Sequence, residues 1–128
     1  MKEDRKLLKL AADATGKKWK WVECPTHDGK VPGFRHVDSV TNAVYWFAWN
    51  PLEDDGDALR MFTRMPFCEL YVSEIGVTVF LPRKTPGDGP NLKCDEYAAE
   101  HGGDMDAATR RAIVRAAAEI QRQREASK

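Results

Sequence analysis

The chain lacks several features that would place it in a membrane or outside the cell. None of its apolar runs approaches the roughly eighteen residues that cross a bilayer as a helix, so we expect no membrane segment. Its first six residues, MKEDRK, carry charges of both signs and no apolar stretch, which argues against a secretory signal. The three cysteines are an odd number without the spacing of a disulfide framework. We therefore expect free thiols and a cytoplasmic location.

An excess of charge of one sign is also absent. The 20 basic and 20 acidic side chains give a formal net charge of zero with histidine neutral. This balance excludes a generally basic nucleic-acid coat and a generally acidic mimic of DNA. Hydrophobic residues make up 42% of the chain, which is typical of a globular protein rather than a disordered one. With 128 residues we expect one domain, 1–128, in which 126–128 form a frayed tail.

The charges are nevertheless segregated along the chain. Basic residues dominate in 2–20 and 110–128, and acidic residues dominate in 50–57 and 88–106. Both basic blocks fall in predicted helices, and both acidic blocks precede or open one. Acids near helix N-termini and bases near C-termini match the helix dipole, which is the structural interpretation of the pattern. The functional alternative is a polarised surface with a charged docking patch.

Hydrophobic periodicity predicts an α+β fold. Two long helices are predicted at 3–15 and 105–124, and a short one at 58–65. The segment 43–49, AVYWFAW, is almost continuously apolar, which is typical of a central strand covered on both faces. We expect one antiparallel sheet of four to five strands packed against these two long helices and the short one. The strands are predicted at 17–24, within 34–39, and at 43–49, 67–73 and 76–82.

The spacing of potential metal ligands is irregular. Cys24 and His27 are three residues apart, and Cys94 and His101 are seven apart. The chain has no Cys-x-x-Cys and no His-x-x-x-His pair, so a structural zinc site would need four scattered ligands. We expect neither a metal ion nor a cofactor.

The acidic run EDDGD at 53–57 does not fit a calcium-binding loop. With Gly56 at the sixth position of such a loop, Pro51 would occupy the first position and Phe62 the twelfth. Neither side chain can donate the oxygen that the coordination geometry requires at those two positions. The run therefore needs another explanation.

Capping of a helix is the structural explanation of Asp54, Asp55 and Asp57, because side chains of this type accept hydrogen bonds from the first backbone N–H groups. The functional alternative is an acidic patch beside Trp49 that docks on a basic partner. Tryptophan is enriched among the residues that dominate binding energy at protein interfaces.

Catalytic motifs are missing as well. The only histidines are His27, His36 and His101, and no serine stands in a Gly-x-Ser-x-Gly context. The segment 87–90, GDGP, lacks the lysine and the following helix of a phosphate-binding loop. We expect a protein that is not an enzyme, with a small hydrolase based on carboxylate or histidine chemistry as an alternative.

Three arginines of the last predicted helix, Arg111, Arg115 and Arg122, fall within a narrow arc beside its apolar stripe. They are candidates for binding a protein or a nucleic acid. The alternative of a nucleic-acid or nucleotide-binding module also uses basic residues interleaved with tryptophans, on which bases can stack. These residues are Lys17, Lys18, Trp19, Lys20 and Trp21.

Two blocks of the chain carry a resemblance to known proteins. The segments WNPLEDDGDALR at 49–60 and ATRRAIVRAAAEI at 108–120 resemble a set of small bacteriophage-encoded proteins of unknown function. This resemblance implies a phage or prophage accessory gene that acts in the cytoplasm of the bacterial host. By class-level analogy, such genes often encode inhibitors of host machinery or of host defence.

The sequence thus favours a small non-catalytic accessory protein that binds a host macromolecule and inhibits it. The expected partner is a host or phage protein, with nucleic acid as the alternative, and we expect no membrane partner. The candidate binding residues are Trp49, Asp54, Asp55, Asp57, Arg111, Arg115 and Arg122.

Overall fold

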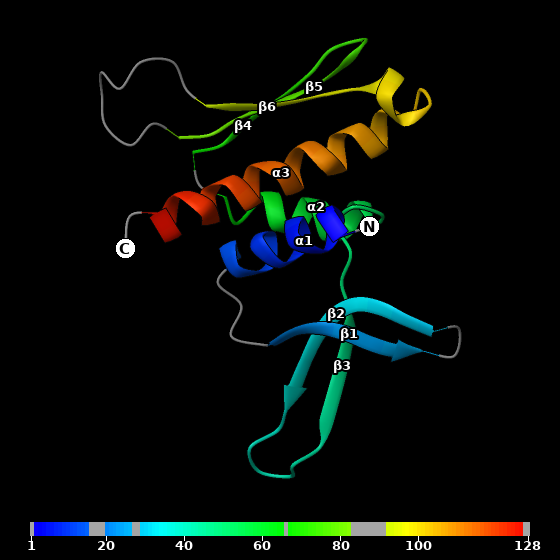
Figure 1. The fold of residues 1–128 in the computed structure, drawn as a ribbon, viewed down its shortest axis with the longest axis vertical. Coiled ribbons are helices and arrows are strands. Elements are labelled where there is room, and N and C mark those ends of the chain that lie inside the picture. The colour runs from blue at the N-terminus through cyan, green and yellow to red at the C-terminus, as the bar shows by residue number, and fades with distance from the viewer. Residues whose placement is uncertain (1, 16–19, 27–28, 66, 83–91, 127–128) are drawn as a thin grey trace.

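The computed structural model describes residues 2–15, 20–26, 29–65, 67–82 and 92–126, which form three α-helices, a 3₁₀ helix and six strands (Figure 1). The strands make two three-stranded antiparallel sheets, with the orders β1-β2-β3 and β4-β5-β6. In chain order the elements are α1 (Lys2–Ala14), β1 (Lys20–Thr26), β2 (Gly29–Val37), β3 (Val44–Ala48), α2 (Asp55–Phe62), β4 (Glu69–Val72), β5 (Gly76–Phe80), β6 (Lys93–Tyr97), the 3₁₀ helix η1 (Ala98–His101) and α3 (Met105–Ala126).

Helix α3 lies at the centre of the arrangement (Figure 1). The β4–β6 sheet covers one side of α3, and α1 and α2 pack on the other side. Helices α1 and α3 run side by side in the same direction, because Arg111 donates to Asp4 near one end (3.0 Å) and Arg124 donates to the carbonyl of Ala14 near the other (3.1 Å). The β1–β3 sheet lies beyond α1 at the opposite end of the molecule from β4–β6.

The core forms where these elements meet α3. Five of the seven buried residues of α3 are alanines, whose small side chains let neighbouring elements approach the helix closely. Val79 and Leu81 from the β5 segment face α3 and are almost fully buried, as is Met61 of α2. The β1–β3 sheet joins this core through Phe34, the largest fully buried side chain of the molecule's described part.

Aspartates begin two of the helices. Asp54 accepts a hydrogen bond from the Asp57 backbone N–H (2.8 Å) at the start of α2, and Asp104 accepts one from the Ala107 N–H (3.0 Å) at the start of α3. Each carboxylate satisfies a backbone donor that the helix itself leaves without a partner.

The α+β class is confirmed, but the expected single sheet of four to five strands is wrong. Six strands form two separate sheets, and the α-helices have 13, 8 and 22 residues, so only α3 is long. Periodicity identifies which segments are strands, but strand pairing depends on tertiary contacts. Helix α3, from the end of the chain, lies between the two groups of strands and keeps them apart.

The segment 43–49 departs most from its sequence-based interpretation. We expected a central strand covered on both faces, whereas β3 is an edge strand whose five residues are all exposed. The strand β6 was not predicted, because KCDEY at 93–97 has a weak hydrophobic pattern and follows a loop-like segment. The strands predicted at 67–73 and 76–82 are confirmed as β4 and β5, which pair with each other in antiparallel fashion.

Candidate functional site

Strand β3 presents an aromatic surface. We call its five residues, Val44 to Ala48, the aromatic edge. Tyr45, Trp46 and Phe47 expose 46%, 44% and 44% of their surface, respectively. Strand β2 pairs with one side of β3, and the other side is a free sheet edge in the described part of the chain. The aromatic edge therefore offers both side chains and backbone hydrogen-bonding groups to a partner.

Basic or titratable side chains of β2 flank the aromatic edge on both faces of the sheet. The Arg35 guanidinium lies over the ring of Trp46, 5.8 Å from its centroid. On the other face, the His36 and Tyr45 rings are stacked with centroids 6.4 Å apart. Residues that face each other across the ladder share a face, whereas consecutive residues alternate, so each face of β3 has one such pair.

The aromatic edge differs in charge from the other edge strands. Natural proteins protect exposed edges with charged residues, proline or bulges, because an unprotected edge pairs with other chains. Among the four edge strands that the structure describes, β3 alone has neither a charged residue nor a proline. The sequences of the other three edge strands contain such residues, namely Lys20, Glu23 and Pro25 in β1, Glu69 in β4, and Lys93, Asp95 and Glu96 in β6.

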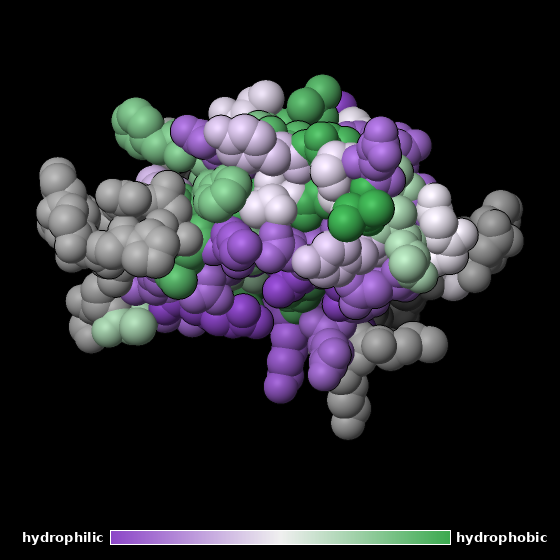
Figure 2. Space-filling model, turned by 90° about the horizontal axis from the view of Figure 1, so that it is seen from above, coloured by the Kyte–Doolittle hydropathy of each residue, from purple (hydrophilic) through white to green (hydrophobic). Residues whose placement is uncertain are grey.

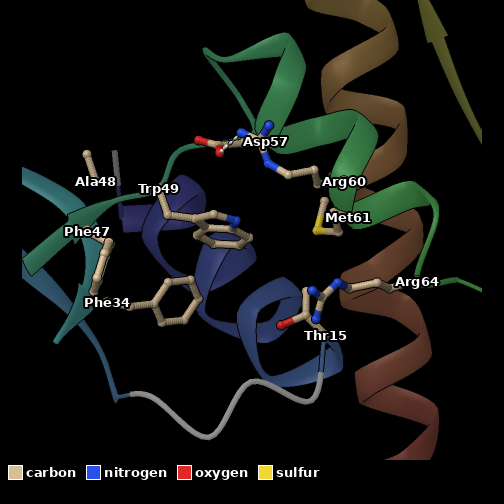
Figure 3. Close-up of a pocket in the computed structure, with 9 residues that line it drawn as sticks. All are labelled: Thr15, Phe34, Phe47, Ala48, Trp49, Asp57, Arg60, Met61 and Arg64. Carbon is tan, nitrogen blue, oxygen red and sulfur yellow. Dashed lines mark hydrogen bonds and ion pairs between the residues drawn. The ribbon is translucent and has the colours of Figure 1, made fainter. Parts of the chain in front are cut away.

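Trp49, the predicted anchor, is in the interior. It is 7% exposed, and its ring lies against that of Phe34 with centroids 5.1 Å apart. Figure 3 shows both rings at a cavity of about 100 Å³ between the end of the β1–β3 sheet and the helices, with Met61 and Arg64 on the opposite wall. Trp49 thus contributes to the packing between β1–β3 and the helices, and it offers little surface to a partner.

The acidic block has intramolecular partners. Asp54 caps α2, and Asp55 forms an ion pair with Arg110 of α3 at 2.7 Å. Asp57 accepts from the Asn50 backbone N–H (3.0 Å) and pairs with Arg60 at 2.7 Å. These contacts account for all three aspartates structurally, and a docking role for them stays a prediction.

The three predicted arginines of α3 do come together. They line a groove of about 400 Å³ between α1, α3 and β6, which we call the arginine groove. Lys6 of α1 joins them, a residue that the sequence did not connect to α3. The charged residues of the groove are Glu3, Lys6, Arg111, Arg115, Glu119 and Arg122, and Leu7 and Cys94 complete its lining.

Glu96 organises the inner end of this groove. It is 8% exposed and accepts a hydrogen bond from Arg115 Nη1, which also donates to the carbonyl of Asp95 (2.7 Å). His101 Nε2 lies 2.8 Å from the other Glu96 oxygen, which is also 3.9 Å from Arg111 Nε. A buried carboxylate is thereby compensated from several sides. Sequence analysis missed Glu96 because β6 was not recognised.

The two cysteines whose side chains the structure describes give little sign of reactivity. Cys68 and Cys94 are free, and burial raises the pKa of both thiols, so at neutral pH they carry less thiolate than an exposed cysteine. Within the described residues, no group of three histidine, cysteine or acidic side chains is placed to hold a metal ion. No helix in this part of the chain is both long and apolar enough to cross a membrane.

Some predicted residues cannot be compared with the structure. Most basic residues of the strand predicted at 17–24 lie outside the described part of the chain. Trp21, its remaining aromatic residue, is half-buried, and its Nε1 has no hydrogen-bond partner among the described residues. The predicted residues outside the described ones are Lys17, Lys18, Trp19, His27, the segment 87–90 and the tail residues 127–128.

The hydrolase alternative is not supported by the cavity at Trp49 or by the arginine groove. His101 contacts Glu96 but lines neither the cavity at Trp49 nor the arginine groove. His36 stacks on Tyr45 at the aromatic edge and is not among the groove's lining residues either. The two histidines among the described residues are thus engaged in ring stacking or in a hydrogen bond.

The fold and its surfaces define a small α+β protein with two separate three-stranded sheets, one uncharged aromatic edge and one arginine-lined groove. Comparison with models of protein families, with curated proteins and with solved structures finds no match for this chain. The aromatic edge and the arginine groove are therefore its two candidate binding surfaces.

Proposed function

We propose that the protein is a non-catalytic binding module that pairs the free edge of β3 with an extended segment of a partner protein. The observation that carries this proposal is the five-residue aromatic edge, which is exposed throughout and contains no charge. Adding a strand to a sheet edge is a common mode of peptide recognition. Backbone hydrogen bonds then supply affinity, and alternate side chains supply specificity.

The surroundings of the aromatic edge favour a particular partner chemistry. Aromatic side chains and arginine are enriched at the centres of protein interfaces, and here Trp46 and Arg35 lie together. Because Arg35 and His36 flank the strand and β3 adds no acid, an incoming segment that combines apolar side chains with a carboxylate is complementary.

We further propose that the partner is a protein of a bacterial host, that the chain is a phage or prophage accessory protein of the host cytoplasm, and that binding inhibits the partner. These parts of the proposal are supported by the two sequence blocks at 49–60 and 108–120. In the structure both blocks serve the interior, through Trp49 and the α3 alanines. The aromatic edge lies before the first block in the sequence. Substitutions in β3 would therefore change the partner without altering either block.

The test compares three forms of the protein as baits in a nuclease-treated bacterial lysate. In Trp46→Glu a charge enters the aromatic edge beside Arg35. In the matched control Tyr71→Lys, an exposed aromatic residue of the edge strand β4 is replaced by a charge beside Glu69. We expect at least one host protein to bind wild type and Tyr71→Lys equally and Trp46→Glu at least about tenfold less, as measured by quantitative mass spectrometry.

Hydrogen exchange then locates the contact. With the captured protein added, the backbone amides of 44–48 should exchange more slowly, while those of β4 should not change. Equal capture by Trp46→Glu and wild type would contradict the proposal, as would capture that depends on intact nucleic acid. Protection of 44–48 with rising protein concentration alone would instead identify a second copy of this chain as the occupant.

A further inference from the structure

A second, independent surface lies on the other side of α1. We propose that the arginine groove binds the phosphate group of a small phosphate monoester. The groove has a volume of about 400 Å³, within the range of roughly 300–1,000 Å³ that is typical of small-molecule sites. None of its lining residues belongs to β1–β3, so this proposal is independent of the one on the aromatic edge.

The lining of the groove is more basic than the protein as a whole. Four cationic and two anionic side chains line it, in a protein whose formal net charge is zero, and the carboxylates of Asp4 and Glu96 pair with Arg111 and Arg115 from outside the lining. A phosphate monoester, with between about 1.5 and 2 negative charges near neutral pH, offers several strong acceptors to the guanidinium and ammonium donors that remain. Arg111, Arg115 and Arg122 share one face of α3 because their spacings of four and seven residues correspond to nearly whole helical turns.

Two of the arginines are held in place from behind. Arg115 Nη1 bonds to Glu96 and to the carbonyl of Asp95, while Arg111 Nη1 bonds to Asp4. Asp4 and Glu96 are not part of the groove lining, so they fix the guanidinium groups without filling the space in front of them. A ligand that meets prepositioned arginines loses less conformational entropy than one that must order them.

Donors remain for a ligand. A guanidinium has five N–H donors in a planar fork that matches phosphate, and Arg115 uses only Nη1 in its contacts with described residues. The Lys6 ammonium is exposed and has no hydrogen-bond or ion-pair partner within the described part of the chain. Among the residues described, Arg122 has one ion-pair partner, Glu119 on its own helix at 3.3 Å.

The lining also favours a small ligand over a nucleic acid. Among the described residues, no aromatic side chain lines the groove, so they offer bases nothing to stack on. Glu3 and Glu119 lie among the cations and would repel a continuous phosphodiester backbone. A single phosphate group can contact Arg111 and Arg115 alone, whereas a continuous backbone would also have to pass these carboxylates.

The experiment titrates the full chain with three probes: inorganic phosphate, ribose 5-phosphate and a short single-stranded oligonucleotide. NMR signals of the arginine Nε–H groups report the site directly. We expect saturable shifts of Arg111 and Arg115 with the first two probes. Arg122→Gln should weaken binding about tenfold, and Glu119→Gln should strengthen it about threefold, since it removes a negative charge from the lining.

Arg60→Gln is the matched control, because Arg60 is equally an exposed arginine with an ion pair on its own helix, but at the other cavity. Its affinity for ribose 5-phosphate should equal that of wild type. Arg122 and Glu119 are partly exposed, so neither variant threatens folding. Absence of saturable shifts with both phosphates overturns the proposal, as does equal weakening by Arg60→Gln. Preferential binding of the oligonucleotide, with loss in Arg122→Gln, would assign the groove to nucleic acid instead.

Discussion

The two sheets have the same number of strands in the same antiparallel order, yet they are covered very differently. Sheet β4–β6 lies on α3, and Val77, Val79, Cys94 and Glu96 on its inner face are buried. In sheet β1–β3, Phe34 is the only buried side chain among the positions described, and all of β3 is exposed. One sheet is thus part of the core, whereas the other is attached to it at one end.

The outer face of β4–β6 shows how an exposed sheet surface is normally managed. Seen from above in Figure 2, this side of the molecule mixes hydrophilic and hydrophobic residues. Tyr71 donates to Glu69 and packs edge-on against Phe80, so its ring has both polar and apolar neighbours. Exposed aromatic residues therefore occur in both sheets. What distinguishes β3 is that it contains no charged residue.

The comparison predicts unequal costs of truncation in the two sheets. Leu81→Ala removes a side chain that is 1% exposed beside α3, and it should lower the free energy of unfolding by about 2–5 kcal/mol. Val44→Ala, at a residue of β3 that is 42% exposed, should cost less than about 1 kcal/mol. Urea denaturation followed by circular dichroism measures both changes. Similar costs for the two variants would mean that β3 is covered in solution.

Hydrogen exchange should separate the sheets without any substitution. The β5 amides lie in a central strand packed on α3, so they exchange only when much of the core opens. The β3 amides that bond to β2 need only local opening of the end sheet. We expect protection factors in β5 to exceed those in β3 by roughly a hundredfold or more. Equal protection would indicate that both sheets open as one unit.

Local elements followed from the sequence, whereas their assembly did not. The apolar stripe of α3, the helix predicted at 3–15 and the strands predicted at 67–73 and 76–82 could be predicted, since they depend on neighbours in the chain. The apolar run at 43–49 was wrongly predicted to be buried. A continuously apolar strand is buried only where other elements cover both faces of its sheet. For β3, the described chain supplies no such cover.

The candidate sites show the same division. The convergence of Arg111, Arg115 and Arg122 was predicted, because it depends only on helical geometry. The contribution of Lys6 and the support from Glu96 depend on how α1 and β6 pack against α3, which no local pattern encodes. Trp49 was selected for its residue type, but its contact with Phe34 buries it. Trp46, three residues earlier in the chain, is exposed instead.

On the outer face of β4–β6, a hydrogen bond between two side chains should make a small contribution to stability that depends on pH. The Thr78 hydroxyl donates to the Asp95 carboxylate across the strands, and this hydrogen bond lowers the pKa of Asp95 below its ordinary value of 3.8. A lowered carboxyl pKa stabilises the folded state above the ordinary value, and that contribution is lost as the pH falls through the folded-state pKa. Thr78→Val should therefore cost about 0.5–1.5 kcal/mol near neutral pH and progressively less below pH 3.8.

Thr109→Val is the matched control for this prediction. Its hydroxyl donates to the Met105 carbonyl (2.8 Å), which does not titrate, so any cost of that substitution should stay constant with pH. Urea denaturation of both variants and wild type, from about pH 7 down to about pH 3, separates the two behaviours. If the cost of Thr78→Val were equally independent of pH, the hydroxyl would be stabilising β5 through strand packing rather than through Asp95. The charged groups of this sheet would then protect its edges without contributing to its stability.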